Sequence, residues 1–117
     1  FEVASVPFAA GASSFIGELL ARLGLSNIVP ATMGPFPQLS PEFVLRAQPQ
    51  LVMASTTNLA EMPQRPGWRQ LRALQSGARC GFAPAPYDAL MRAGPRLAEA
   101  AEALADCLQA LDRKVMP

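Results

Sequence analysis

The residue types that could carry out chemistry are few in this chain. Its two cysteines, Cys80 and Cys107, are far apart, and they either form a disulfide in an oxidising compartment or remain two buried thiols. There is no histidine, which removes Ser–His and Cys–His nucleophile pairs and histidine metal ligands from this chain. No Walker A or dinucleotide-binding glycine pattern occurs. We therefore expect a binding surface, with no catalytic residues and no metal ligands.

Composition narrows the class further. The 117 residues are 50% hydrophobic, enough for one α/β or all-α domain with its own core. With a net charge of +1 the chain lacks the basic stripe of a nucleic-acid binder. No apolar run approaches the roughly 18 residues of a membrane span. The chain begins at Phe1 without a signal-peptide pattern, so we expect a processed or excised piece of a longer protein.

Periodicity and capping signals predict the elements that position these residues. Ser13 or Ser14 caps a helix that ends at Gly24, and Ser40 with Pro41 starts a helix that ends near Gln48. The predicted strands cover 1–5, 27–29, 51–54 and 79–83. The predicted helices cover 15–23, 41–48, 68–74 and a last one from about 95, with an irregular or partly helical segment at 58–67 and a loop at 84–88.

Strands and helices alternate in this order, which predicts an α/β fold, a three-layer α/β/α sandwich with a mainly parallel central sheet. Ligands of such sheets gather beyond the carboxyl ends of the strands. The loops leaving those ends include Pro7 with Phe8, and Tyr87 with Asp88.

Four segments, in order, resemble the helical-backbone class of periplasmic metal-chelate binding proteins, with cobalamin-binding members the most similar. They are GASSFIGELLARLGLSNI at 11–28, FPQLSPEFVLRAQPQLV at 36–52, PGWRQL at 66–71 and RAGPRL at 92–97. Proteins of this family have two lobes joined by a long helix, with the ligand between the lobes. The resemblance covers the C-terminal lobe over residues 1–117, and it implies that the N-terminal lobe and the connecting helix are absent from this chain.

The resemblance also implies a function and a location. The family captures a metal chelate, such as cobalamin, haem or a ferric siderophore, and delivers it to the permease of an ABC importer in the inner membrane. The chain would then act without catalysis, in the periplasm or on the outer face of the cell membrane if it is lipid-anchored.

By the same resemblance, Phe8 and Phe36 match aromatic positions that face the chelate, and Arg92 matches a basic position at the cleft. Flat macrocycles suit aromatic faces, and guanidinium suits propionates or phosphate. The alternatives are core packing for the two phenylalanines and a solvated surface position for Arg92. Tyr87 and Asp88 share a predicted loop and could reach the ligand, and Tyr87 could also ligate haem iron. Where cobalamin binders can carry an acid, this chain has Met91, so the ligand stays open among the three classes.

Glu42 matches the glutamate with which this family docks on arginines of the permease. The alternative is an ordinary acid in the first turn of a helix, and the two roles are compatible. Two other functions remain: a fragment or subunit of a cytoplasmic α/β enzyme of nitrogenase-like fold, and a purely structural α/β module.

Overall fold

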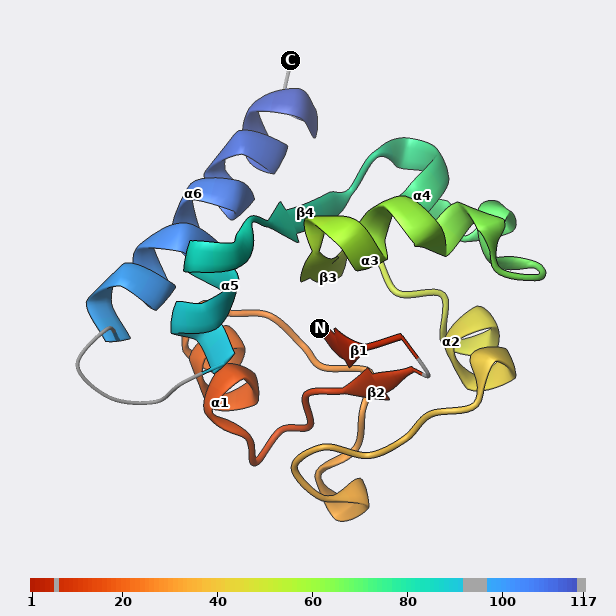
Figure 1. Cartoon of the computed structure of the whole chain (residues 1–117), viewed down its shortest axis with the longest axis horizontal. Coiled ribbons are helices and arrows are strands. Elements are labelled where there is room, and N and C mark those ends of the chain that lie inside the picture. The colour runs from red at the N-terminus through yellow and green to blue at the C-terminus, as the bar shows by residue number, and fades with distance from the viewer. Residues whose placement is uncertain (6, 92–96, 116–117) are drawn as a thin grey trace.

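The computed structural model describes residues 1–5, 7–91 and 97–115 of the chain, without the side chains of 97 and 112–115. It mixes helices with short strands, and its α/β class confirms the expectation from the sequence. The strands make two pairs in the described ranges (Figure 1). β1 (Glu2–Ala4) and β2 (Phe8–Ala9) are antiparallel, whereas β3 (Val52–Ser55) and β4 (Arg79–Phe82) are parallel.

The parallel part of the sheet is therefore the β3–β4 pair, and the described residues do not join it to β1 and β2 through hydrogen bonds. β1 nevertheless lies beside β3. Its register shifts between Glu2 and Ala4, and such an irregularity bends a strand and interrupts its pairing. A central sheet of four strands, as expected from the sequence, is reduced here to two pairs that lie side by side.

The two faces of the β3–β4 pair belong to two hydrophobic clusters. Val52 and Ala54 of β3 pack with Leu59 and Trp68 on one side. Met53 of β3 and Phe82 of β4 pack on the other side, with residues of α1 (Phe15–Arg22), α5 (Pro84–Met91) and α6 (Leu97–Val115). Successive residues of a strand point to opposite faces, so this alternation places helices against both faces of the parallel pair.

The first two helices begin where their caps predict. In α1 (Phe15–Arg22) the Ser14 hydroxyl accepts the backbone N–H of Gly17 at 2.9 Å. In α2 (Pro41–Ala47) the Ser40 hydroxyl accepts that of Phe43 at 3.1 Å. Each bond satisfies one of the free N–H groups of a helix start.

The helices of the second half surround the parallel pair (Figure 1). α3 packs against β3 and β4, and α5 packs against α6, β4 and α1. The segment predicted to be irregular holds the end of α3 and a 3₁₀ turn. The bounds are α3 (Thr56–Glu61), η2 (Met62–Gln64), η3 (Trp68–Gln70), α4 (Arg72–Ser76), α5 (Pro84–Met91) and α6 (Leu97–Val115), with η1 (Ala31–Met33) in the first half.

The helix expected at 68–74 is divided at Leu71 into η3 and α4. Two further predicted elements are wrong. The strand expected at 27–29 is a turn, because the Asn27 side chain accepts the backbone N–H of Val29 at 3.0 Å and donates to the Ala10 carbonyl at 2.9 Å. The loop expected at 84–88 is the start of α5. Pro84 and Pro86 lie in its first turn, where a missing N–H costs no helical hydrogen bond.

The two cysteines form a disulfide, Cys80–Cys107, with the sulfur atoms 2.01 Å apart. It joins Cys80, which is fully buried in β4, to the middle of α6. Of the two possibilities that the sequence left open, the paired state is the one observed.

Candidate functional site

Phe8 and Phe36 lie on two segments joined by a short antiparallel ladder. Phe8 is paired with Gln38, and this pair is flanked by hydrogen bonds from Ala9 N to Pro37 O at 3.1 Å and from Leu39 N to Pro7 O at 2.9 Å. A third bond, from Gly11 N to Pro35 O at 2.7 Å, continues the ladder.

This bonding pattern sets the register of Phe36. The Gly11 bond places Ala10 opposite Phe36, and the matching bond from residue 37 is missing because proline has no N–H. Phe8 and Phe36 are therefore diagonal neighbours on the same face of the ladder, within reach of aromatic side chains. β2 was not predicted from the sequence, because it is only two residues long and pairs with β1 on one side and, through the Phe8–Gln38 bridge, with a segment thirty residues further along the chain on the other.

The two phenylalanines differ in exposure. Phe36 is 53% exposed, the largest value among the exposed large hydrophobic residues of the described chain, and Phe8 is half-buried. Prolines on both sides of Phe36 restrict its backbone. An aromatic ring held in water on a stiff segment offers a flat apolar surface to a partner.

Gly11 lets the two segments of the ladder approach one another. A Cβ atom at this position would overlap the carbonyl oxygen of Gly34. Gly34 itself has φ of 88°, in the left-handed region that favours glycine. The backbone at these two glycines therefore holds the turn that presents Phe36.

Tyr87 lies inside α5 and not in a loop. Its hydroxyl donates to the Val3 carbonyl at 2.8 Å, and its ring stacks at 6.4 Å from that of Phe1. Burial, and secondarily the negative charge of Glu2, raise the pKa of Tyr87. The Tyr87 hydroxyl therefore connects α5 to β1, and its hydrogen-bond donor is already used within the chain.

The remaining predicted residues lie apart from the ladder or outside the described ranges. Asp88 follows Tyr87 in α5 and is half-buried. Arg92 lies in 92–96, outside the residues that the structure describes. Glu42 is exposed in the first turn of α2 and lines a hollow of about 300 Å³ together with Leu45, Glu61 and Arg65.

A partly buried ionic cluster was not anticipated from the sequence. Arg65 forms an ion pair with Glu2 at 2.6 Å and another with Glu61 at 3.2 Å, and its guanidinium lies 4.5 Å from the ring centroid of Trp68. The hydrogen bond to Glu2, partly offset by burial, raises the pKa of Arg65. The only sequence signal was the i,i+4 spacing of Glu61 and Arg65, which is common on helices without any function.

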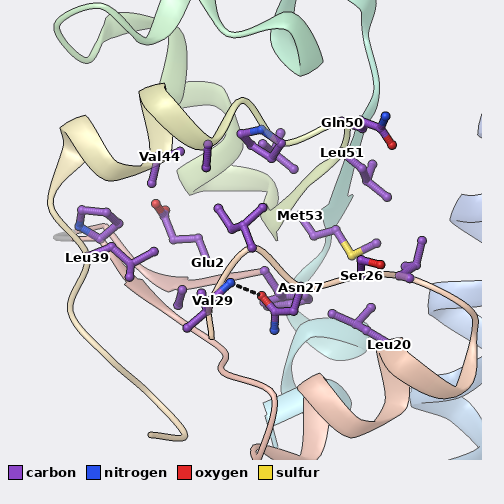
Figure 2. A pocket seen from close by; sticks show the side chains of 18 of the residues that line it. Glu2, Leu20, Ser26, Asn27, Val29, Leu39, Val44, Gln50, Leu51 and Met53 are labelled. Carbon is purple, nitrogen blue, oxygen red and sulfur yellow. Dashed lines mark hydrogen bonds between the residues drawn. The ribbon is translucent and has the colours of Figure 1, made fainter. Parts of the chain in front are cut away.

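A larger cavity of about 540 Å³ lies where the chain enters β1 and β3. Figure 2 shows its walls, with Leu20 from α1, Val29 from the turn after it, Val44 from α2 and Met53 from β3. The Asn27 side chain, bonded to the backbone N–H of Val29, lies at the same wall. Sequence patterns did not predict this cavity, because its walls come from many separated segments of the chain.

Within the described ranges, no helix is long and apolar enough to cross a membrane. The same ranges contain no group of three or more Cys, Asp or Glu side chains arranged to hold a metal ion. No protein-family model matches the chain, and no curated protein matches it.

Proposed function

We propose that this chain is a ligand-capturing lobe of a binding protein that serves an ABC importer, and that it takes up a metal chelate through the face of the ladder that bears Phe8 and Phe36. The observation that carries the proposal is the 53% exposure of Phe36 on a proline-flanked segment. A corrin, a porphyrin or a catecholate complex presents flat apolar faces, and an exposed phenylalanine is complementary to such a face.

Two further observations support the proposal. The Cys80–Cys107 disulfide suits an oxidising compartment such as the periplasm. Glu42 is exposed at the start of α2, where the positive end of the helix dipole favours an acid and water leaves it accessible to a basic partner. The resemblance carried by four segments of the sequence also supports this function, and it implies a permease as the partner.

The test is a titration of the chain with haemin, cyanocobalamin and a ferric tris-catecholate, followed by visible absorbance. We expect saturable binding of one of the three. Phe36→Ala should weaken it at least roughly tenfold, since fully burying a phenylalanine side chain contributes about 1.5–3 kcal/mol. Leu23→Ala is the matched control, because Leu23 is another exposed apolar side chain, 37% exposed, at the end of α1.

Loss of affinity in Phe36→Ala but not in Leu23→Ala supports the proposal. Failure of all three chelates to bind, or equal effects of the two substitutions, contradicts it. A two-lobe protein that contains this chain should bind the same chelate more tightly, because a second lobe would supply the other wall of the cleft. Equal affinity of the chain and the two-lobe protein would contradict the shared cleft.

A further inference from the structure

The ladder face that bears Phe8 and Phe36 also carries a polar side chain, that of Gln38. Phe8 and Gln38 lie directly opposite one another, and the residues before and after them make the backbone hydrogen bonds, at 3.1 and 2.9 Å. In antiparallel pairs that are flanked in this way the side chains are closest, with about 4.5–5.5 Å between the Cβ atoms. Gln38 therefore lies beside Phe8 on the face proposed to bind a chelate.

The amide of Gln38 is available to a ligand. The residue is exposed, and its side chain has no hydrogen-bond partner among the described residues. By contrast, the Gln48 side-chain oxygen accepts the N–H of Arg72 at 3.2 Å. A side-chain amide has an acceptor oxygen and an NH₂ donor, and it carries no charge. Gln38 can therefore exchange hydrogen bonds with amide or hydroxyl groups at the rim of a ligand that covers Phe8.

Both segments of the ladder are uncharged. No Asp, Glu, Lys or Arg occurs in residues 3–17 or 23–41, which contain the whole ladder. The apolar part of this surface includes Met33, which is 41% exposed and precedes Phe36 by three positions. An anion placed against such a surface loses hydration without gaining a counter-charge, and this loss is unfavourable.

The charged side chains that the structure places beside one end of the ladder are mostly acidic. Pro7, a residue of the ladder, lines the hollow of about 300 Å³ together with Glu42, Glu61 and Arg65. Arg65 is already bound to Glu2 and Glu61. Glu42 is exposed, and no ion pair of its side chain occurs within the described ranges. These charges therefore repel an anionic ligand and do not attract it.

We propose that this face selects metal chelates that are uncharged and carry amide or hydroxyl groups at their rim, and that Gln38 recognises those groups. Phe8 and Phe36 contact the flat body of the chelate, and the Gln38 amide bonds to its rim. The inference rests on the proposed function, because it assigns a substrate class to the same face. Ferric tris-catecholate is an anion and haemin carries propionates, so cyanocobalamin is the one of the three chelates named above that fits this class.

Matched pairs of chelates that differ in charge test the inference. Cyanocobalamin is compared with its acid derivative, in which rim amides are hydrolysed to carboxylates. A neutral ferric tris-hydroxamate is compared with the ferric tris-catecholate. Titrations of the chain followed by visible absorbance should give, in the pair that binds, a Kd at least roughly tenfold lower for the uncharged member, because the carboxylate or phenolate is left without a partner.

Gln38→Lys tests the assigned residue. Gln38 is exposed, so the substitution should leave the fold intact. A lysine beside Phe8 should tighten the binding of the charged member and reduce the preference for the uncharged one roughly fivefold. Gln75→Lys is the matched control, because Gln75 is exposed in α4, outside the ladder, and the substitution adds the same charge. Its preference should equal that of the wild type.

The possible failures of the inference and of the proposed function differ. Binding of the charged member as tightly as the uncharged one would overturn the inference, leave the proposed function standing and favour the role implied for Arg92. Failure of every chelate to bind would contradict the proposed function, and the inference with it. Equal effects of Gln38→Lys and Gln75→Lys would overturn the assignment of Gln38.

Discussion

Arg65 binds the carboxylate of Glu2 through two parallel hydrogen bonds, from Nη1 to Oε1 at 2.6 Å and from Nη2 to Oε2 at 2.9 Å. Their side chains are 12% and 7% exposed, and their positions are 63 residues apart. The pair therefore connects β1 to the 3₁₀ turns that follow α3. Two-pronged pairing of this kind fixes orientation as well as distance.

Removal of one partner from this pair should destabilise the fold. Arg65→Met leaves the Glu2 carboxylate buried without its counter-charge, and we expect the free energy of unfolding to fall by about 3 kcal/mol. The double variant Glu2→Leu/Arg65→Met should regain most of this loss, because neither member of the pair is then left buried without the other. Urea denaturation followed by the fluorescence of Trp68 measures all three proteins.

Arg72→Met is the matched control, since Arg72 is exposed and no ion pair of its side chain is recorded among the described residues. It should change the free energy of unfolding by less than about 0.5 kcal/mol. Equal stabilities of Arg65→Met and Arg72→Met would show that the pair with Glu2 contributes nothing.

Local signals in the sequence predicted the elements that depend on neighbouring residues. Ser14 and Ser40 begin their helices as caps, and Gly24 and Gly77 end theirs with φ near 80°, which glycine adopts without strain. The buried strand β3 was predicted from its apolar run between polar or proline residues. These features involve contacts within a few residues.

Long-range relationships were the ones that the sequence did not reveal. The bridge between Phe8 of β2 and Gln38 joins positions thirty residues apart. A local signal also misled: the prolines at 84 and 86 favour a loop, but they lie in the first turn of α5. The pairing of Glu2 with Arg65 depends on how the chain returns past β1. For the candidate site, the sequence singled out Phe8 and Phe36 but not their common ladder, and it did not indicate the cavity beside Trp68.

The disulfide should stabilise the fold mainly by restricting the unfolded chain. For the loop of 27 residues between Cys80 and Cys107, we expect its loss to cost about 3 kcal/mol. The comparison is between oxidised wild type and the double variant Cys80→Ala/Cys107→Ala in urea. Titration of thiols in denaturant should find none in the wild type, and the appearance of two free thiols would contradict the pairing.

A reducing agent provides the control for that measurement. It should lower the stability of the wild type and leave the double variant unchanged. If the reducing agent lowers the stability of both proteins equally, it acts on something other than the disulfide. The measurement would then contradict a stabilising role for the disulfide.

Tyr87 should make stability fall in alkaline solution. Its pKa is raised in the folded protein by burial and by Glu2, so the unfolded chain loses this proton at a lower pH than the folded chain does. The contribution is fully present below the ordinary tyrosine pKa near 10 and is lost as pH rises through the raised value. Tyr87 is the single tyrosine of the chain, so tyrosinate absorbance reports its ionisation alone.

Tyr87→Phe removes this ionisation. We expect it to cost about 1 kcal/mol at neutral pH, through the lost hydrogen bond to the Val3 carbonyl. The stability difference from wild type should then narrow as the pH rises above about 10. A difference that stays constant up to about pH 11 would contradict the raised pKa of the phenol.

The docking role proposed for Glu42 and its structural role in α2 predict free-energy effects of different size. An exposed acid in the first turn of a helix contributes a few tenths of a kcal/mol to folding, whereas truncating a charge pair in a protein interface costs about 2 kcal/mol or more. In a two-lobe protein that contains this chain, the proposal predicts that Glu42→Ala leaves melting temperature and chelate affinity almost unchanged and still slows uptake through the reconstituted importer. Glu42→Arg should slow uptake further, because it repels a basic partner.

The matched control is Glu18→Ala, since Glu18 is likewise an exposed acid in the first turn of a helix, here α1. Both alanine variants lose one charge at a helix start, so both should fold equally well. Only the Glu42 variant should slow uptake, because the docking surface is proposed at α2. Normal uptake by both Glu42→Ala and Glu42→Arg would show that Glu42 acts only at the start of its helix and does not dock. Equal slowing of uptake by Glu18→Ala would show a general effect of removing an acidic charge.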